Sequence, residues 1–514
     1  MKKTTNSKDA FIKNSFEIKK AHTFAEKIQQ LIASYVSKQQ VSEQYNTQVL
    51  ADAFAFQSIP EIGYSEEEFI EELAKKLLPY TTYVGTPNFI GHMTTALPNF
   101  IPEVASLVAT LNQNVVKIET SQAATFYERQ AIAMLHELMY ENTETFYHEH
   151  IHNIDSTLGI VTSGGTIANI SALQCARNRM FPHMEKTGNN TGKIGVVICS
   201  ELGHYSLKKA MGILGLGSDQ LVIVPTDAHN KIRIDLLEKA IQNCQELEQH
   251  IVALIGIAGT TECGSIDPLE AMAALAATHD IYFHVDAAWG GPTLLSDKYK
   301  PLLKGIEKAD SITIDGHKQL YLPMGIGVVL FKNPTTSESI EKESEYIIRK
   351  TSIDLGKRSI EGSRPFHSFY VQAGFKLLGK QKYAWLIEKG IETAREMATY
   401  VETLQDFELL TAAETNIFLY RCLPKSIHSN EDSIITDITK MNNKINVFNK
   451  AIQQKQMKQG NTFVSYTTVA LEKYNKQKIV GLRVVVANPL ITLAHFKKSI
   501  EEQRTLASTI ESNL

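Results

Sequence analysis

The sequence predicts an α/β protein built on a mostly parallel sheet. Between about residues 106 and 375, short apolar runs alternate with helical stretches, which is the pattern of repeated strand–helix–strand units. Runs such as 159–162 and 251–257 lack alternating polar residues, as expected for strands covered by helices on both faces. At 514 residues, the chain is long enough for two or three domains with large cores.

We expect three parts along the chain. Residues 1–105 form an N-terminal helical segment, residues 106–375 the large α/β domain and residues 376–514 a small C-terminal α+β domain. Within the last part, the polar stretch 424–459 has a helix-like pattern over 434–454. We interpret it as an added surface helix.

Composition and charge narrow the possible functions. A net charge of −4 leaves no basic stripe for nucleic acid. No apolar run approaches the roughly 20 residues that a membrane helix needs, and the first residues lack the apolar segment of a secretory signal. The five cysteines are scattered without a Cys-x-x-Cys pair, which indicates reduced thiols and a cytoplasmic protein.

Three histidines alternate along the chain at His148, His150 and His152. On a strand they would share one face and could bind a metal ion. A solvated connector is the simpler interpretation, and we expect no metal in this protein.

Two strand ends carry most of the chemical information. The apolar run 281–285 ends at Asp286, and the run 311–314 is followed by Asp315-Gly316-His317-Lys318. In open α/β sheets, ligands bind at the carboxyl ends of the strands. An Asp and a Lys there suit pyridoxal 5′-phosphate, because the amine forms a Schiff base with the aldehyde and the carboxylate keeps the pyridine nitrogen protonated. A lysine alone is most often a solvated surface residue, so the hypothesis depends on the pair.

Three further loops stand at predicted strand ends. The loop 163–166 reads Ser-Gly-Gly-Thr and opens a helical stretch, so its N–H groups and the helix dipole favour an anion such as a phosphate. His204 is a candidate to stack on the pyridine ring, and Thr261 could place a hydroxyl near it. Each signal is weak alone, because glycine and threonine also occur in ordinary turns and a histidine after a strand is commonly a loop residue.

Together these segments resemble the group II pyridoxal-phosphate-dependent amino-acid decarboxylases from about residue 87 to about residue 489. The most specific shared parts are 284–288 and 315–318. The resemblance implies the fold-type I architecture, with a seven-stranded, mostly parallel sheet in the large domain and a small C-terminal α+β domain. It also implies a homodimer, formed with the help of the N-terminal segment, whose active site lies at the subunit interface.

The resemblance assigns roles to individual residues. It implies Lys318 as the Schiff-base lysine, Asp286 as the partner of the pyridine nitrogen and His204 as the stacking ring. It places Thr261 beside the ring and His317 against the phosphate or the substrate. The phosphate would be held by Ser163, Gly164, Gly165 and Thr166.

The resemblance also implies a substrate-binding arginine. Arg483 lies in the strand-like segment 481–487, where the family grips the substrate α-carboxylate. The planar guanidinium suits bidentate carboxylate binding better than a lysine does. A structural ion pair is the alternative role for this residue.

Three segments are similar to the bacterial pyridoxal-dependent aspartate 1-decarboxylases: 86–93, 111–117 and 361–364. This implies decarboxylation of L-aspartate to β-alanine for pantothenate synthesis. His92 falls where glutamate decarboxylases carry a Gln that touches the substrate side chain. A protonated or hydrogen-bonding His92 could meet a distal carboxylate, and a loop histidine without contacts is the alternative.

Other activities on the same fold stay open. They are decarboxylation of glutamate, cysteine sulfinate or diaminobutyrate, transamination, and a non-catalytic binding role. His204 and the His317-Lys318 pair favour a decarboxylase. Related decarboxylases use a loop tyrosine to protonate the substrate carbon after CO2 leaves, and Tyr346 is the candidate here, although its spacing to 354–356 departs from the family pattern.

Overall fold

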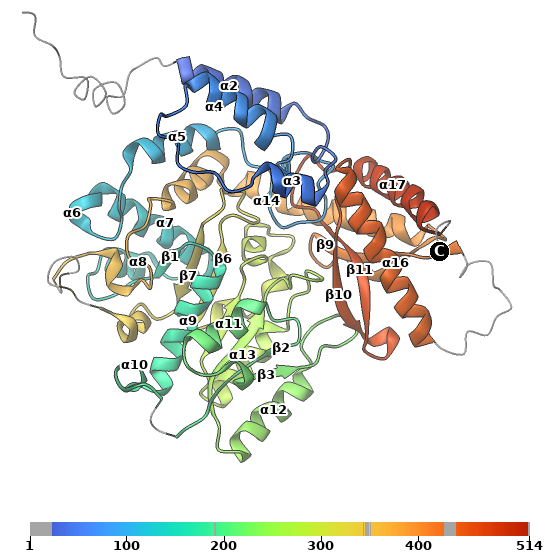
Figure 1. Cartoon of the computed structure of the whole chain (residues 1–514). Coiled ribbons are helices and arrows are strands. Elements are labelled where there is room, and N and C mark those ends of the chain that lie inside the picture. Colours follow the sequence, from blue (N-terminus) through green and yellow to red (C-terminus); the bar gives the residue numbers. More distant parts are fainter. Residues whose placement is uncertain are drawn as a thin grey trace, which may run out of the picture.

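The structure is a computed structural model that describes residues 23–189, 192–342, 344, 349, 351–425 and 438–511. Figure 1 shows a large α/β body, drawn mainly in green and yellow, with the blue N-terminal helices above it. The orange and red C-terminal domain lies to its right.

A seven-stranded sheet forms the centre of the large domain, in the order β1-β7-β6-β5-β4-β2-β3. Its strands are β1 (Gly159–Thr162), β2 (Gly195–Ser200), β3 (Leu221–Val224), β4 (His250–Ile257), β5 (Phe283–Asp286), β6 (Ser311–Asp315) and β7 (Gly327–Phe331). Strand β7 pairs antiparallel with β1 and β6, and the other pairs are parallel. The predicted seven-stranded, mostly parallel sheet is confirmed.

Helices cover both faces of this sheet. They include α7 (Ala123–Tyr140), α9 (Gly165–Met180), α11 (Tyr205–Ile213), α12 (Ile234–Glu246) and α13 (Leu269–Thr278). Val196 and Ile198 of β2 pack into one core with α7, α12 and α13, whereas Val197 and Cys199 pack on the other side with α9 and α11. Because successive residues of a strand point to opposite faces, this double cover explains the apolar strand sequences.

The small domain contains a four-stranded antiparallel sheet in the order β10-β11-β9-β8. The strands are β8 (Phe407–Thr411), β9 (Ile417–Cys422), β10 (Ser465–Leu471) and β11 (Gln477–Val485). Helices α16 (Ile438–Gln459) and α17 (Leu493–Glu511) pack against each other and against this sheet.

Helix α16 confirms the helix expected within 424–459 and corrects only its interpretation as an added surface helix. Ile445, Phe448 and Ile452 of this helix are buried, the last two in the core of the small domain. The polar composition hid this role because Asn449 and Gln456 are also buried, where they make hydrogen bonds. Residues 426–437 of the stretch lie outside the described residues.

The N-terminal part contains short helices: α2 (Thr23–Val36), α3 (Thr47–Ala53), α4 (Glu66–Glu72), a π-helical turn (Leu73–Leu77) and α5 (Ile101–Leu111). Helix α14 (Ser368–Glu402), interrupted at Gly379 with φ +71°, leads into the small domain.

Helix α5 runs across residue 105 and helix α14 runs across residue 375, the two boundaries expected from the sequence. The three-part division of the chain therefore stays a proposal. The shorter helices are α6 (Ile118–Ser121), α8 (Glu144–His150) and α10 (Met184–Thr187).

The alternating histidines do not lie on a strand. His148 and His150 belong to helix α8, where residues two apart point in different directions, so the shared face suggested by a strand does not exist. Within the described parts of the chain, no helix has the length and apolar character needed to cross a lipid bilayer.

Candidate active site

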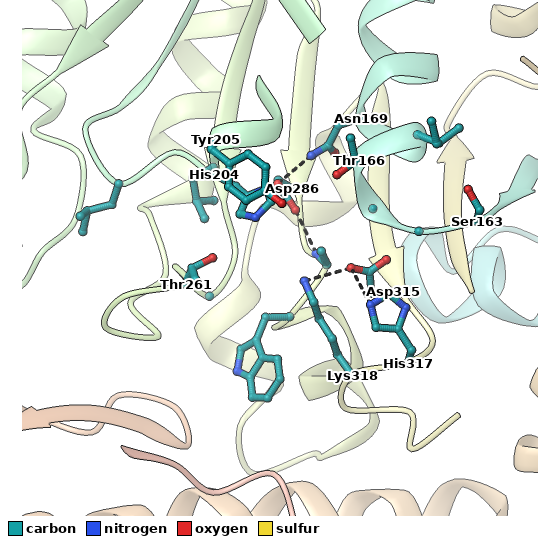
Figure 2. A pocket seen from close by; sticks show the side chains of 18 residues that line it. Ser163, Thr166, Asn169, His204, Tyr205, Thr261, Asp286, Asp315, His317 and Lys318 are labelled. Atoms are coloured by element: carbon teal, nitrogen blue, oxygen red, sulfur yellow. Dashed lines mark hydrogen bonds and ion pairs between the residues drawn. The ribbon is translucent and has the colours of Figure 1, made fainter. Parts of the chain in front are cut away.

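A cavity of about 290 Å³ lies at the carboxyl edge of the large sheet. It is lined by nine residues that the sequence marked as cofactor-binding candidates: Ser163, Gly164, Gly165, Thr166, His204, Thr261, Asp286, His317 and Lys318. These residues follow or end β1, β2, β4, β5 and β6, whose carboxyl ends meet at one edge (Figure 2). The topology of the sheet therefore brings together segments that lie far apart in the sequence.

Asp286 is the last residue of β5 and is buried. Its Oδ2 accepts a hydrogen bond from Asn169 Nδ2 at 2.9 Å, and its Oδ1 accepts one from the Ala288 N–H at 3.2 Å. Both donors are neutral, so they fix the carboxylate without cancelling its charge. A buried anion of this kind stabilises a protonated ring nitrogen placed against it.

Asn169 is in turn oriented by His284, which lies two residues before Asp286 on β5. Burial lowers the pKa of His284, so its ring is neutral at neutral pH. Its Nε2 is 3.1 Å from Asn169 Oδ1, and its Nδ1 is 2.8 Å from Ser311 Oγ. Because an amide oxygen only accepts, Nε2 donates and the Ser311 hydroxyl donates to Nδ1. This chain of hydrogen bonds turns the Asn169 amide N–H towards Asp286.

The glycine loop between β1 and α9 depends on close packing. A Cβ atom on Gly327 would lie 2.4 Å from the carbonyl carbon of Gly164, so no side chain fits between this loop and β7. Helix α9 begins at Gly165. Its first N–H groups have no partner within the helix, so this N-terminus is suited to binding an anion. The Ser163 N–H already donates to a carboxylate oxygen, Glu361 Oε2, at 3.0 Å.

Lys318 lies three residues after the end of β6 and reaches into the cavity (Figure 2). Its Nζ is 2.9 Å from Asp315 Oδ2. The neighbouring His317 donates from Nδ1 to the Ile326 carbonyl at 3.0 Å, which leaves Nε2 on the side of Asp315, 3.7 Å from Oδ2. The amine is therefore held beside the glycine loop by an acid that ends the same strand.

His204 is fixed as the N-cap of α11. Its Nδ1 accepts from the Ser206 N–H at 3.3 Å and lies 2.8 Å from Ser206 Oγ, so the ring proton sits on Nε2. Burial lowers the pKa of His204, while Asp286 acts in the opposite direction. The result is an oriented ring on the cavity wall, suited to stacking against a flat ligand.

Arg483 and His92 are not among the residues that line this cavity. Arg483 is buried on β11 and donates to three neutral oxygens: the Thr261 carbonyl at 2.7 Å, the Gly91 carbonyl at 3.4 Å and Ser465 Oγ at 3.1 Å. It thus contacts the backbone of a lining residue, Thr261. Burial lowers the pKa of Arg483, and the nearby Glu262 carboxyl opposes this shift.

His92 follows Gly91 and is solvent-exposed in the single chain. Its Nδ1 accepts from the Thr94 N–H at 3.1 Å, which leaves the proton on Nε2. The surrounding protein atoms lower the pKa of His92, and the positive charges of Arg483 and Lys318 add to this effect. A neutral ring is therefore expected at neutral pH, in place of the protonated form considered from the sequence.

Sequence analysis missed two residues that shape the site, Asn169 and Asp315. Asn169 lies one turn after Gly165 on α9, and only the fold places it against Asp286. Asp315 ends an apolar strand as Asp286 does, and this strand-end position could have marked it in the sequence as a residue of the site. Tyr346, the candidate catalytic acid, lies outside the described residues.

Comparisons with known proteins identify the class. A model of the pyridoxal-dependent decarboxylase conserved domain matches residues 52–422. The sequence is 40% identical over 501 residues to an aspartate 1-decarboxylase of Aliivibrio fischeri, a match that covers 95% of this chain and 91% of the relative. It is 28% identical over 484 residues to an aromatic-L-amino-acid decarboxylase of Bacillus atrophaeus, covering 93% and 92%.

The fold also matches solved structures. A crystal structure of mouse CSAD superposes with a TM-score of 0.83 at 21% identity, covering 94% of this chain and 98% of that chain. The glutamate decarboxylase domain of a Vibrio parahaemolyticus protein superposes with a TM-score of 0.81 at 20% identity, covering 98% and 100%. These matches confirm the predicted fold-type I architecture.

The chain belongs to the family of pyridoxal-dependent decarboxylases. It is an amino-acid decarboxylase whose cofactor is pyridoxal 5′-phosphate, as the two strand-end motifs predicted. The cavity fits that cofactor chemically: it offers an anion-binding loop, a buried carboxylate, a lysine amine and an oriented ring. In addition, Asp315 Oδ1 is a buried acceptor without a hydrogen-bond partner among the described residues.

Proposed function

We propose that this enzyme removes the α-carboxylate of L-aspartate and releases β-alanine and CO2. The observation that carries the proposal is 40% identity, over 95% of the chain, with a relative named aspartate 1-decarboxylase. His92, which lies near the charges of Arg483 and Lys318 and carries its proton on Nε2, supports a substrate with an acidic side chain. Other relatives are named for 2,4-diaminobutyrate or for acidic amino acids in general, which defines the alternatives to test.

The roles proposed for the cofactor-binding residues follow from their surroundings. Bound pyridoxal phosphate withdraws electrons from the bond to the substrate carboxylate. Lys318 holds the cofactor by its amine, Asp286 keeps a proton on the ring nitrogen and His204 packs against the ring. The loop 163–166 and His317 bind the phosphate, and Thr261 lies beside the ring.

Two residues are proposed to bind the substrate. Arg483 donates its hydrogen bonds to neutral oxygens, so its positive charge can attract the α-carboxylate and orient the bond that breaks. His92 offers its Nε2–H to the distal carboxylate. Because its pKa is lowered, His92 is proposed to select aspartate by hydrogen bonding and not by charge.

Tyr346 stays the proposed acid that returns a proton to the substrate carbon. We also propose a cytoplasmic enzyme that supplies β-alanine for pantothenate synthesis. Both proposals follow the family resemblance of the sequence.

We further propose a homodimer whose interface includes the N-terminal segment. In the single chain, large apolar side chains around α3 are strongly exposed: Val49, Phe54, Phe56, Ile59 and Ile62. Phe56 and Ile59 expose 95% and 93% of their surface, which is unfavourable for a monomer in water. Sedimentation of the parent should give a dimer, and Phe56→Asp with Ile59→Asp should shift it towards monomer. A parent that sediments as a monomer would contradict the proposed homodimer.

The substrate proposal is tested by comparing kcat/KM for L-aspartate, L-glutamate, cysteine sulfinate and 2,4-diaminobutyrate in the parent holoenzyme. The amine product and released CO2 are identified for each substrate, which separates decarboxylation from transamination. Aspartate should give the largest kcat/KM, with β-alanine as the product. A larger kcat/KM for any of the other three amino acids would overturn the proposed substrate and leave the family assignment intact.

A further inference from the structure

A second cavity, of about 20 Å³, lies inside the large domain between α7, the start of β1 and the segment 354–364. Helix α7 and strand β1 pack against each other and lie side by side in Figure 1. Among the described parts of the chain, this cavity shares no lining residue with the cofactor cavity. Its volume leaves room for one small particle, such as a water molecule or a halide ion.

The charges that line this small cavity do not balance. They belong to three cations and two anions, each with 8% or less of its surface exposed: Arg129, Arg358, Arg364, Glu128 and Asp354. Three cations against two anions leave a net charge of +1. Behind Arg358, the Glu341 carboxylate and the Lys357 amine are 3.2 Å apart and together add no charge. A net charge inside a protein is unfavourable unless a counterion compensates it.

Arg129 has no acid of its own. Its Nε donates to the Ile151 carbonyl at 2.6 Å and its Nη2 to the Asn153 carbonyl at 2.5 Å, and among the described residues it forms no ion pair. Burial lowers the pKa of Arg129 to about 10, the charge of Arg358 adds to this shift and Glu128 opposes it. The guanidinium therefore stays charged at neutral pH, and its carbonyl partners do not cancel that charge.

Two guanidinium N–H groups at this cavity have no acceptor. Arg364 uses both of its Nη atoms on the Glu128 carboxylate. Arg358 uses Nη1 on the Ile154 carbonyl at 3.3 Å and Nη2 on Glu341 Oε2 at 2.7 Å. The Nε atom of each arginine is buried and has no hydrogen-bond partner within the part of the chain that the structure describes. Buried donors are nearly always satisfied, so two open donors beside one small cavity indicate an acceptor inside it.

A monovalent anion suits these surroundings better than a water molecule does. Water brings two O–H donors that need acceptors of their own, and it leaves the charge of +1 in place. A halide ion only accepts hydrogen bonds, and its charge of −1 balances the lining. Sulfate, phosphate and carboxylate ions have several heavy atoms each, so they are too large for a cavity of about 20 Å³.

We propose that this cavity binds one halide ion, which is chloride under ordinary salt conditions, through the Nε–H groups of Arg358 and Arg364 and the charge of Arg129. The ion joins α7 and β1 to the segment 354–364 and stabilises the folded protein, since it binds a site that only the fold assembles. In the same segment, Glu361 accepts from the Ser163 N–H at 3.0 Å, so the ion also supports the glycine loop from behind. The inference does not depend on which amino acid is the substrate.

Bromide scatters X-rays anomalously and locates the site directly. Crystals of the holoenzyme are soaked in sodium bromide, and the anomalous peaks are mapped. A peak is expected inside the cavity, next to the Nε atoms of Arg358 and Arg364. A cavity that holds only a water molecule in the soaked crystals would overturn the proposal.

Thermal unfolding of the holoenzyme tests the ion in solution. The cofactor is kept bound, so its phosphate occupies the glycine loop and halide does not act there. Sodium chloride is compared with sodium gluconate at equal ionic strength, because gluconate is too large for the cavity. Relative to gluconate, chloride should raise the Tm by about 1 °C for each ten-fold rise in concentration above its Kd. Bromide in the crystal without this chloride effect would show binding at crystal concentration only and would also overturn the proposal.

Arg129→Gln tests the role of the unbalanced charge. The variant brings the lining to zero net charge, and its amide can still donate to the Ile151 carbonyl, so the chloride effect on the Tm should disappear. Arg395→Gln is the matched control, because Arg395 on α14 also donates to carbonyls, those of Ala413 at 3.2 Å and Glu414 at 3.3 Å, away from the cavity. It should keep the chloride effect of the parent.

The two variants separate the site from a general effect of salt. The same chloride effect in Arg129→Gln as in the parent would overturn the proposal, and so would its loss in Arg395→Gln. The bromide map and the melting of the parent need no variant, so they decide the question even if Arg129→Gln does not fold. None of these measurements uses an amino acid, so their outcome is independent of the proposed decarboxylation of aspartate.

Discussion

The two halves of the proposed site are built in different ways. In the cofactor half, Asp286 ends β5 and Lys318 follows β6, two neighbouring parallel strands of one sheet, and both residues line one cavity. In the substrate half, His92 and Arg483 come from the N-terminal part and from β11 of the small domain. Arg483 joins these parts by donating to the carbonyls of Gly91 and Thr261. The first half depends on sheet topology, whereas the second depends on how three distant segments meet.

This difference predicts different kinds of damage. Changes in the cofactor half should reduce turnover of every substrate, because all substrates use the same cofactor. Changes in the substrate half should leave the bound cofactor intact and alter KM or the choice of amino acid.

The largest effect is expected for Lys318→Ala. The variant should lose the visible Schiff-base absorbance and essentially all turnover, because no other lysine lines the cavity among the described residues to release the product. Absorbance spectra and CO2 release are the measurements. Turnover within about ten-fold of the parent, a loss of only about 1.4 kcal/mol of transition-state stabilisation, would exclude Lys318 as the cofactor-binding lysine.

Asp286→Asn should come next, with a loss of about 1000-fold in kcat, equivalent to about 4 kcal/mol. The neutral amide is nearly the same size but does not hold a proton on the ring nitrogen. The variant should still bind the cofactor and show Schiff-base absorbance. Asn169→Ala is the comparison, because it keeps the carboxylate while removing its hydrogen bond at 2.9 Å together with the bonds of Asn169 to His284 and Ser206, so its loss should be smaller. Equal losses in both variants would contradict a special role for the charge.

Arg483→Ala should lower kcat/KM for all amino acids by about 100-fold, equivalent to about 2.7 kcal/mol. Every substrate carries the α-carboxylate, so the loss should not depend on the side chain. Arg483→Lys should recover only part of the loss, since an ammonium lacks the bidentate geometry. Unchanged cofactor absorbance is the control for folding. A loss confined to acidic substrates would move Arg483 to recognition of the side chain.

The smallest and most selective effect is expected for His92. His92→Ala should reduce kcat/KM for aspartate by about ten-fold, the cost of one hydrogen bond to a charged group, and should affect an apolar amino acid less. His92→Gln should keep most of the activity if the neutral ring donates a hydrogen bond. Because the pKa of His92 is lowered, the neutral ring should donate this bond at neutral pH, and a fall in pH through that lowered value should keep the Nε2–H and add a positive charge that favours the distal carboxylate. Equal losses on all substrates would remove His92 from a role in specificity.

The sequence predicted which residues of the cofactor half would meet in one cavity because they stand at the ends of apolar runs, and their individual roles stay proposals. Asp286 and Lys318 could be located from such runs alone, and the mostly parallel sheet then requires them to lie near each other. The hydrogen-bond chain from Ser311 through His284 to Asn169 could not be predicted, because it joins β6, β5 and α9 through side-chain contacts that no sequence spacing encodes.

Outside the site, the surface interpretation of one helix was wrong for a physical reason. The stretch 424–459 appeared to belong at the surface because of its polar composition, yet α16 buries polar side chains that are hydrogen-bonded inside the small domain. For the alternating histidines, the strand was only the alternative to a solvated connector, and it is excluded for His148 and His150 because they lie on α8, with Thr143 capping its first turn.

The most direct test of the account is to reduce the holoenzyme with borohydride and map the labelled peptide. Reduction converts the Schiff base into a stable bond, so the label marks the lysine that holds the cofactor. A single label is expected on Lys318, at the carboxyl edge of the sheet beside Asp315. A label on any other lysine would contradict the assignment of this cavity as the active site.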